Sequence, residues 1–156
     1  MSEIKRHVVS AILWADDDCV LLQQRDDRPD LRYAGCWTLF GGQVEDGEEP
    51  EFAIRRELVE ELDLDDQPLV LFESYVCPAR TVPGGVTTIN HVYTGHLSRP
   101  FGSLSLHEGQ GMALVTREQA AQLDLAFMQS PALDRWFAWY ENGQAARDPL
   151  SSGGRA

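Results

Sequence analysis

The chain has little cysteine, no long apolar run and few basic residues, and each shortage excludes a class of protein. Its cysteines, Cys19, Cys36 and Cys77, are odd in number and widely spaced, and no CxxC pair occurs. This pattern argues against a disulfide framework and a zinc knuckle, and it fits a reducing cytoplasm. The apolar run from Val8 to Trp14 is too short to span a membrane, and residues 1–6 lack the layout of a signal peptide. We therefore expect a cytoplasmic protein without a membrane partner.

Basic residues are outnumbered, with 13 Lys and Arg against 25 Asp and Glu and a formal net charge of −12. A general nucleic-acid-binding protein would present a basic face, so we expect no nucleic-acid partner. The same charge repels anionic small molecules in solution. If the protein binds such an anion, a divalent cation and local arginines must reverse the field at the site.

The length and the proportions of hydrophobic and charged residues describe an ordinary globular domain. The chain has 156 residues, of which 43% are hydrophobic and 24% are charged, which suits one domain with its own core. We expect this single domain to occupy residues 1–142. Residues 143–156 are polar and small, and we expect them to form a disordered tail.

Short apolar stretches rich in β-branched residues predict strands, and stretches with helical periodicity predict helices. The predicted strands are His7–Trp14, Val20–Arg25, Cys36–Phe40, Leu69–Cys77, Thr87–Leu97 and His107–Val115. The first and second strands are expected to form a hairpin, as are the fourth and fifth. Helices are predicted from Pro50, after an N-cap at Thr116, and over Ala132–Tyr140. This order of elements favours a mixed α/β domain with helices on both faces of a sheet.

The central stretch, Gly41 to Leu64, joins a glycine turn to an acidic helix that starts near Pro50. Apolar side chains recur at every fourth position and define the face that should pack on the sheet: Ile54, Leu58, Leu62. Acidic side chains share a different face: Glu57, Glu60, Glu61. A solvated acidic surface is one interpretation of this cluster. The other is a divalent cation, which would offset the repulsion between carboxylates within one turn.

The spacing of Gly42, Glu48 and the run from Arg56 to Leu64 resembles the signature of the Nudix hydrolase family. That signature reads G-x5-E-x7-R-E-U-x-E-E-x-G-U, where U is a bulky aliphatic residue, and every defined position matches except one. Asp63 stands at the last glycine, where we expect a left-handed helix end that Asp tolerates, so the fold should stay intact. Phe40 also stands before the glycines where Pro is usual.

The resemblance implies an α/β/α sandwich built around a mixed β-sheet, and it implies an enzyme. Nudix hydrolases use water to cleave a diphosphate linkage in a nucleoside diphosphate that is joined to another group. We therefore expect a metal-dependent pyrophosphohydrolase with a small-molecule nucleotide as its partner and Mg²⁺, or alternatively Mn²⁺, as its cofactor. The expected metal ligands are carboxylates of the acidic helix and one carbonyl oxygen that precedes it: Glu57, Glu60, Glu61, Gly41.

The resemblance also implies roles for residues around this metal. Either Glu61 or Glu108 is the expected general base, since Glu108 lies in an EGQ segment that resembles one placed opposite the signature in many Nudix enzymes. Glu48 is expected to pair with Arg56 and orient the helix against the glycine turn, because an Arg–carboxylate fork fixes geometry. Contact of Glu48 with a second metal through water is the alternative. Arg25 is expected to contact a phosphate or a base, or else to be an exposed charge at a strand end.

The sequence does not choose between substrates. A nucleoside triphosphate, ADP-ribose and a nucleotide sugar all stay open, because the pocket residues of this family lie outside the signature. The rival function is a nucleotide sensor that keeps the Nudix fold without turnover, and the retained glutamates favour catalysis. Dimers are common in the family, so a homodimer is an expectation by analogy alone.

Overall fold

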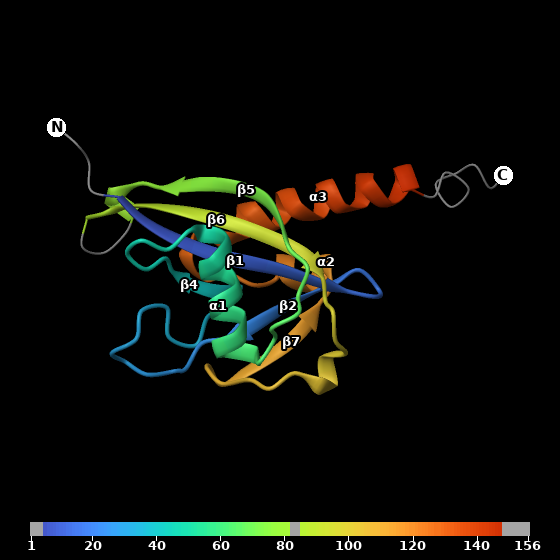
Figure 1. Ribbon diagram of the computed structural model, residues 1–156, viewed down its shortest axis with the longest axis horizontal. Helices are drawn as coiled ribbons and strands as arrows, with labels where there is room; N and C mark the ends of the chain where they lie inside the picture. Colours follow the sequence, from blue (N-terminus) through green and yellow to red (C-terminus); the bar gives the residue numbers. More distant parts are fainter. Residues whose placement is uncertain (1–4, 82–84, 148–156) are drawn as a thin grey trace.

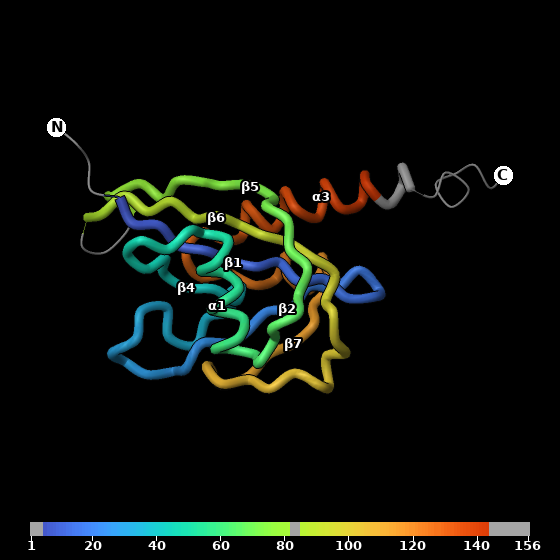
Figure 2. Tube along the Cα trace, in the orientation of Figure 1, coloured from blue at the N-terminus to red at the C-terminus, as the bar shows by residue number. Residues whose placement is uncertain are grey.

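The computed structural model describes residues 5–81 and 85–147, and Figure 2 follows their path. The strands are β1 (Lys5–Ala15), β2 (Cys19–Gln24), β3 (Trp37–Thr38), β4 (Phe40–Gln43), β5 (Val70–Cys77), β6 (Thr87–His96) and β7 (Gly111–Val115). The α-helices are α1 (Pro50–Leu62), α2 (Arg117–Ala121) and α3 (Gln129–Arg147). Short 3₁₀ turns are η1 (Ala79–Thr81), η2 (Phe101–Ser103) and η3 (Ala126–Met128).

Within the described residues the strands form one mixed sheet, in which β1 and β2 each pair with three other strands. β1 runs parallel to β6 along nearly its whole length. It pairs antiparallel with β2 at one end and with β4 between Val8 and Ala11. β2 pairs in turn with β3 and β7, and β6 pairs with β5 in the predicted hairpin. The predicted glycine turn, Gly41 and Gly42, is part of strand β4 instead, because both residues pair with β1. This pairing holds the two glycines against the middle of a central strand.

Helices cover both faces of the sheet, as Figure 1 shows. On one face, the apolar stripe of α1 enters a buried core: Ile54, Leu58, Leu62. On the other face, α3 contributes its own stripe to a second core: Leu133, Trp136, Phe137, Tyr140. The strands contribute side chains to both cores, because successive residues of a strand point to opposite faces of the sheet. The α/β/α sandwich and both helix stripes predicted from the sequence are confirmed.

Two predicted strands differ from the structure. The stretch Cys36–Phe40 forms two short strands rather than one, because the chain shifts its pairing from β2 to β1 at Phe40. β7 begins at Gly111 rather than at His107. Glu108 therefore lies in the loop before β7, where the alternation of side chains between the two faces of the sheet does not apply.

The last helix is longer than predicted at both ends. α3 runs over Gln129–Arg147 instead of Ala132–Tyr140, so the expected start of the tail at Gly143 falls inside the helix. An apolar stripe marks only the packed part of a helix, and the backbone bonds continue beyond it. The rest of the predicted tail, residues 148–156, lies outside the described residues.

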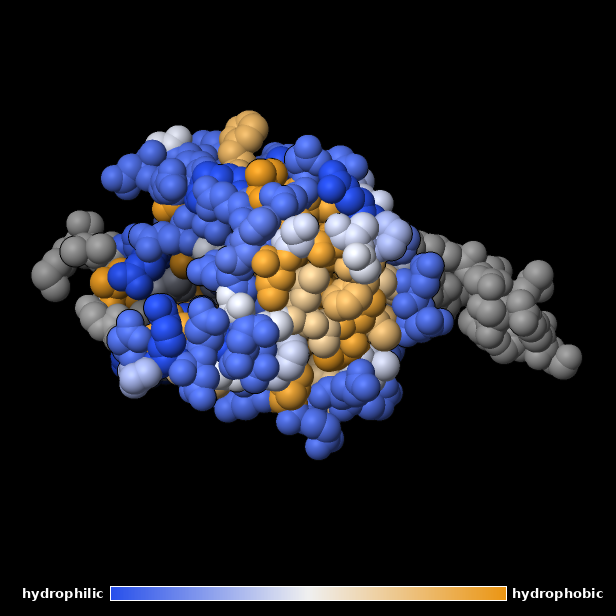
Figure 3. Space-filling model, turned by 90° about the horizontal axis from the view of Figure 1, so that it is seen from below, coloured by the Kyte–Doolittle hydropathy of each residue, from blue (hydrophilic) through white to orange (hydrophobic). Residues whose placement is uncertain are grey.

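The surface reflects the acidic composition of the chain. Figure 3, a view from below, shows mostly hydrophilic side chains around an apolar area in the middle of the face. In Figure 1 this lower side carries β7 and the connection from β6, where Leu104, Leu106 and Leu114 are partly buried against the core under α1. Among residues 5–81 and 85–147, no helix is both long and apolar enough to cross a membrane.

Candidate active site

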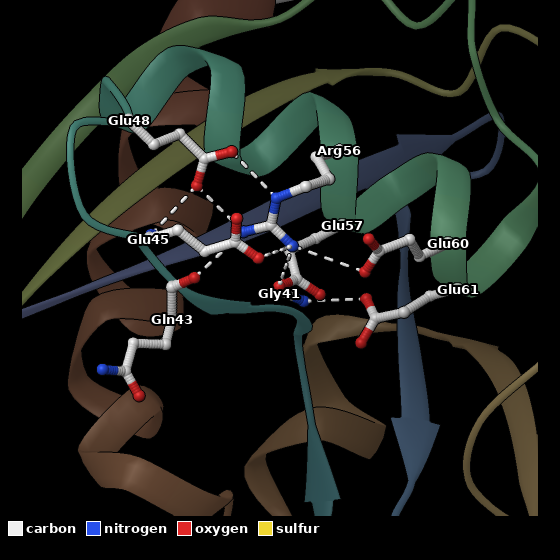
Figure 4. Close-up of polar contacts among 8 residues, drawn as sticks. All are labelled: Gly41, Gln43, Glu45, Glu48, Arg56, Glu57, Glu60 and Glu61. Carbon is white, nitrogen blue, oxygen red and sulfur yellow. Dashed lines mark hydrogen bonds and ion pairs between the residues drawn. The ribbon is translucent and has the colours of Figure 1, made fainter.

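A cavity of about 480 Å³ opens between α1, β4 and the loop that follows β2. Several residues with predicted roles line it: Arg25, Gly41, Glu57, Glu61, Glu108. Glu48, just before α1, and Arg56, in the middle of α1, lie beside these carboxylates (Figure 4). Glu60 lies outside the lining, with 58% of its side chain exposed. The fold thus gathers residues from four separate parts of the sequence around one cavity.

The two glycines of β4 leave room for the carboxylates because they have no side chains. A Cβ on Gly41 would lie 1.9 Å from the carbonyl oxygen of Val9, so only glycine lets β4 approach β1 this closely. A Cβ on Gly42 would lie 2.3 Å from a carboxylate oxygen of Glu57. β4 therefore passes directly beside α1, and the Gly41 N–H donates to the carboxyl group of Glu61 at 3.1 Å.

Arg56 fastens α1 to β4, as Figure 4 shows. Its Nε and Nη2 donate to the two carboxylate oxygens of Glu48 at 2.8 and 2.9 Å. Nη2 also donates to the carbonyl oxygen of Gln43 at 3.1 Å, and Nη1 donates to Glu57 at 3.0 Å. Hydrogen bonding to this guanidinium lowers the pKa of Glu48 to about 2. The expected contact between Glu48 and Arg56 is present, and its orienting role stays a prediction.

Glu61 is almost fully buried, with 4% of the residue exposed. Burial raises its pKa to about 9, and a hydrogen bond with Glu108 adds to this effect. Burial also raises the pKa of neighbouring Glu57. Without a cation nearby, Glu61 therefore keeps its proton at neutral pH.

This set of oxygen atoms fits a divalent cation. Carboxylates that face each other in a buried region are stabilised by a cation between them, and oxygen is the ligand that Mg²⁺ and Mn²⁺ prefer. Within the part of the chain that the structure describes, no three or more His, Cys, Asp and Glu side chains form a ready metal cage. Mg²⁺ needs no such cage, because it is often held by one or two carboxylates together with waters and substrate phosphates. Glu57 and Glu61 meet that requirement.

The loop side of the cavity is basic, although the protein as a whole is acidic. Arg25, at the end of β2, donates through Nε to the carbonyl oxygen of Arg32 at 3.0 Å, and its guanidinium lies 5.1 Å from the centroid of the Phe127 ring. The guanidinium of Arg32 lies 4.6 Å from the centroid of the Tyr33 ring, and its buried Nε has no hydrogen-bond partner among the described residues. Arg28 also lines the cavity. These arginines supply the local positive field that an anionic ligand requires.

Comparison with known proteins assigns the chain to a family. A model of the NUDIX domain matches residues 4–140. The chain belongs to the Nudix family. It is 34% identical over 131 residues to the CTP pyrophosphohydrolase of Escherichia coli strain K12, which covers 84% of this chain and 90% of that protein. It is 31% identical over 74 residues to the 8-oxo-dGTP diphosphatase of Proteus vulgaris, which covers 47% of this chain and 64% of that protein.

A solved structure shows the same fold. A mutT/nudix family protein from Listeria innocua superposes on this Nudix chain with a TM-score of 0.74 at 22% identity, covering 93% of this chain and 99% of that one. The family model and the pyrophosphohydrolase relatives together identify this Nudix protein as a pyrophosphohydrolase. The family and the class of enzyme predicted from the signature are therefore confirmed.

Sequence reasoning missed a group of buried amides that line the cavity of this Nudix enzyme. Asn90, in β6, is 2% exposed. Its Oδ1 accepts from the hydroxyl of Ser10 at 3.0 Å, and its Nδ2 donates to the hydroxyl of Tyr75 at 2.8 Å. Asn90 is one of several polar residues in β6, so the sequence of the strand does not show which of their side chains reaches a cavity.

Two glutamines line the same cavity with unused hydrogen-bonding groups. Gln129 is 4% exposed, and its Oε1 accepts from the Thr38 hydroxyl and the Leu39 N–H, both at 2.9 Å. Its Nε2 has no partner within residues 5–81 and 85–147, and Gln23, which is 5% exposed, makes no side-chain hydrogen bond there. These amide groups line the cavity and are not sealed inside the core, so they are available to bind a polar ligand.

Proposed function

We propose that this Nudix enzyme is a Mg²⁺-dependent nucleoside triphosphate pyrophosphohydrolase. Its reaction would consume one water molecule and convert a nucleoside triphosphate into the monophosphate and pyrophosphate. The observation that carries the proposal is that one cavity joins carboxyl groups suited to a metal with buried amides suited to a base. The names of two relatives give CTP and 8-oxo-dGTP as substrates, which favours a triphosphate over ADP-ribose or a nucleotide sugar.

The carboxylate side of the cavity would hold the metal through Glu57, Glu61 and the carbonyl oxygen of Gly41. Glu60 would join this set from the rim. When bound, Mg²⁺ or alternatively Mn²⁺ would neutralise charge on the phosphate oxygens and lower the pKa of a water molecule. Glu61 must release its proton to act as a ligand, and the N–H of Gly41 keeps one of its oxygens in place. Arg56 would hold the ligand-bearing turns of α1 against β4.

We assign removal of the proton from water to Glu108 rather than to Glu61. Glu61 is nearly inaccessible and is already engaged by Gly41, whereas Glu108 is exposed and also lines the cavity. A general base must return its proton to solvent after each turnover, which an exposed carboxylate can do. The hydrogen bond between the two carboxyl groups keeps Glu108 next to the proposed metal ligands.

The remaining sides of the cavity would bind the substrate. Arg25, Arg28 and Arg32 would face the phosphates, where their charge offsets the acidity of the protein. Gln129 presents N–H donors because its carbonyl oxygen is already occupied, and such donors match acceptor atoms of a base, such as N3 and O2 of cytosine. Gln23 offers both a donor and an acceptor to the same ligand.

A turnover screen tests this proposal. The purified full-length protein is incubated with Mg²⁺ and CTP, dCTP, 8-oxo-dGTP, ADP-ribose or UDP-glucose, and the products are separated by chromatography. We expect a triphosphate to yield its monophosphate and pyrophosphate. Turnover should be largely lost in Glu61→Gln and Glu108→Gln but retained in Glu51→Gln, a control on the same helix outside the cavity. Turnover of ADP-ribose or UDP-glucose alone would refute the substrate class, and binding without any turnover would favour a sensor instead.

A further inference from the structure

The connection between β6 and β7, residues 97–110, is fastened to the C-terminal end of α1, beside which it runs in Figure 1. Near its start, Arg99 donates to the carbonyl oxygen of Asp63 at 3.2 Å. Near its end, Nε2 of His107 lies 2.7 Å from a carboxylate oxygen of Asp63, and the His107 N–H donates to the carbonyl oxygen of Glu61 at 2.9 Å. Asp63 therefore contacts both ends of this connection.

Asp63 is also the residue that replaces the last glycine of the Nudix signature. It ends α1 with φ 54° and ψ 31°, a left-handed conformation that glycine adopts with less strain. The N–H groups of Asp63 and Leu64 donate to the carbonyl oxygens of Val59 and Leu58, so the backbone alone closes the helix. The side chain of Asp63 is not needed for that task, and within the described residues it is hydrogen-bonded to His107.

His107 directly precedes Glu108, whose carboxyl group is hydrogen-bonded to Glu61 in the cavity. One bond to the imidazole and one to the backbone hold His107 against the end of α1, and the preceding Leu106 is partly buried against the core. The position of Glu108 is therefore set by its neighbour. We propose that Asp63 is a positioning residue that holds His107 and so keeps Glu108 where it acts on water. This inference rests on the function proposed for Glu108.

A purely helix-ending role for Asp63 makes a different prediction for glycine at this position. Asp63→Gly relieves the left-handed strain, so a helix-ending role alone predicts equal or higher thermal stability together with wild-type turnover. Positioning predicts that kcat falls while KM changes little, whatever happens to the stability. Because the contact with His107 is partly exposed, we expect a fall in kcat of about fivefold, the rate equivalent of roughly 1 kcal/mol.

Two further variants separate the lost hydrogen bond from general effects. Asp63→Asn tolerates the same backbone and still offers an oxygen to the imidazole, so it should keep kcat near the wild-type value. Glu141→Ala removes an ion pair with Arg117 of comparable exposure, 2.6 Å long and outside the cavity, and it should leave kcat unchanged. A fivefold loss in either protein would overturn the proposal.

A double-mutant cycle with Glu108→Gln shows whether Asp63 acts through Glu108. We expect Asp63→Gly to lower kcat in the wild-type background and to have no further effect once Glu108 is already Gln. Wild-type kcat in Asp63→Gly, or the same loss in both backgrounds, would overturn the inference.

Amide hydrogen exchange distinguishes failure of this inference from failure of the proposed function. Exchange around His107 should be faster in Asp63→Gly than in Asp63→Asn, because only glycine removes the side-chain contact. If Glu108→Gln alone keeps full turnover, the proposed function names the wrong base. Faster exchange would then still support the structural link, and unchanged exchange would overturn it.

Discussion

The buried carboxyl group of Glu61 should make the metal-free protein less stable as the pH rises. Its pKa in the folded protein is about 9, against 4.5 for an ordinary Glu. Between these values the unfolded chain has lost the proton and the folded protein still holds it, so the folded state binds more protons. The favourable contribution of this group is complete below the lower pKa and is lost as the pH rises through the folded value. The free energy of unfolding should fall by about 1.4 kcal/mol per pH unit across this range.

The variant Glu61→Gln isolates this effect because Gln copies the protonated acid. It can still accept from the N–H of Gly41 and can still donate to Glu108, but it has no proton to lose. Between pH 6 and pH 8 the wild type should lose about 3 kcal/mol of stability relative to the variant, since two pH units each contribute about 1.4 kcal/mol. For a domain of this length, that loss is a relative fall in Tm of roughly 6–12 °C.

The assay is urea unfolding of both proteins at pH 6, 7 and 8 in the presence of EDTA, followed by circular dichroism. Parallel pH dependence in the two proteins would refute the conclusion that Glu61 holds a proton at neutral pH. Addition of Mg²⁺ at pH 8 should then stabilise the wild type more than Glu61→Gln, because only the wild type can offer a carboxylate at position 61. Equal stabilisation of both proteins would refute the assignment of Glu61 as a metal ligand.

Three further substitutions test separate parts of the site. Arg56→Ala removes the hydrogen bonds to Glu48, Glu57 and the Gln43 carbonyl and should lower the urea midpoint of unfolding; an unchanged midpoint would show that the pair does not hold α1. Gly42→Ala places a methyl group where the Glu57 carboxylate lies, so Mg²⁺ affinity measured by calorimetry should fall about tenfold while the circular dichroism spectrum is kept. Gln129→Leu removes N–H donors from the cavity and should raise KM for the triphosphate about tenfold with little change in kcat. An unaltered KM would exclude this amide from substrate binding.

The sequence by itself determined the family, the fold class and the helix that carries the acidic residues. This was possible because the signature is local: Glu57, Glu60 and Glu61 lie within two turns of one helix, whose periodicity fixes which side chains share a face. The pairing of Glu48 with Arg56 was predictable for a similar reason, since both belong to the same signature and are only eight residues apart. Local spacing did not show that Glu60 lies outside the cavity lining with a mostly exposed side chain, because that depends on what packs against the helix.

Tertiary structure alone decided the shape and the electrostatics of the cavity. Glu108 and Gln129 reach it only because β7 and α3 pack against strands that come much earlier in the chain, and no local pattern encodes those contacts. The raised pKa of Glu61 depends on burial, which is a property of the folded molecule and not of the residue. The contact between Asp63 and His107 likewise depends on the folded structure. Asp63 departs from the signature, and its side chain binds His107 because residues far apart in sequence meet at the end of α1.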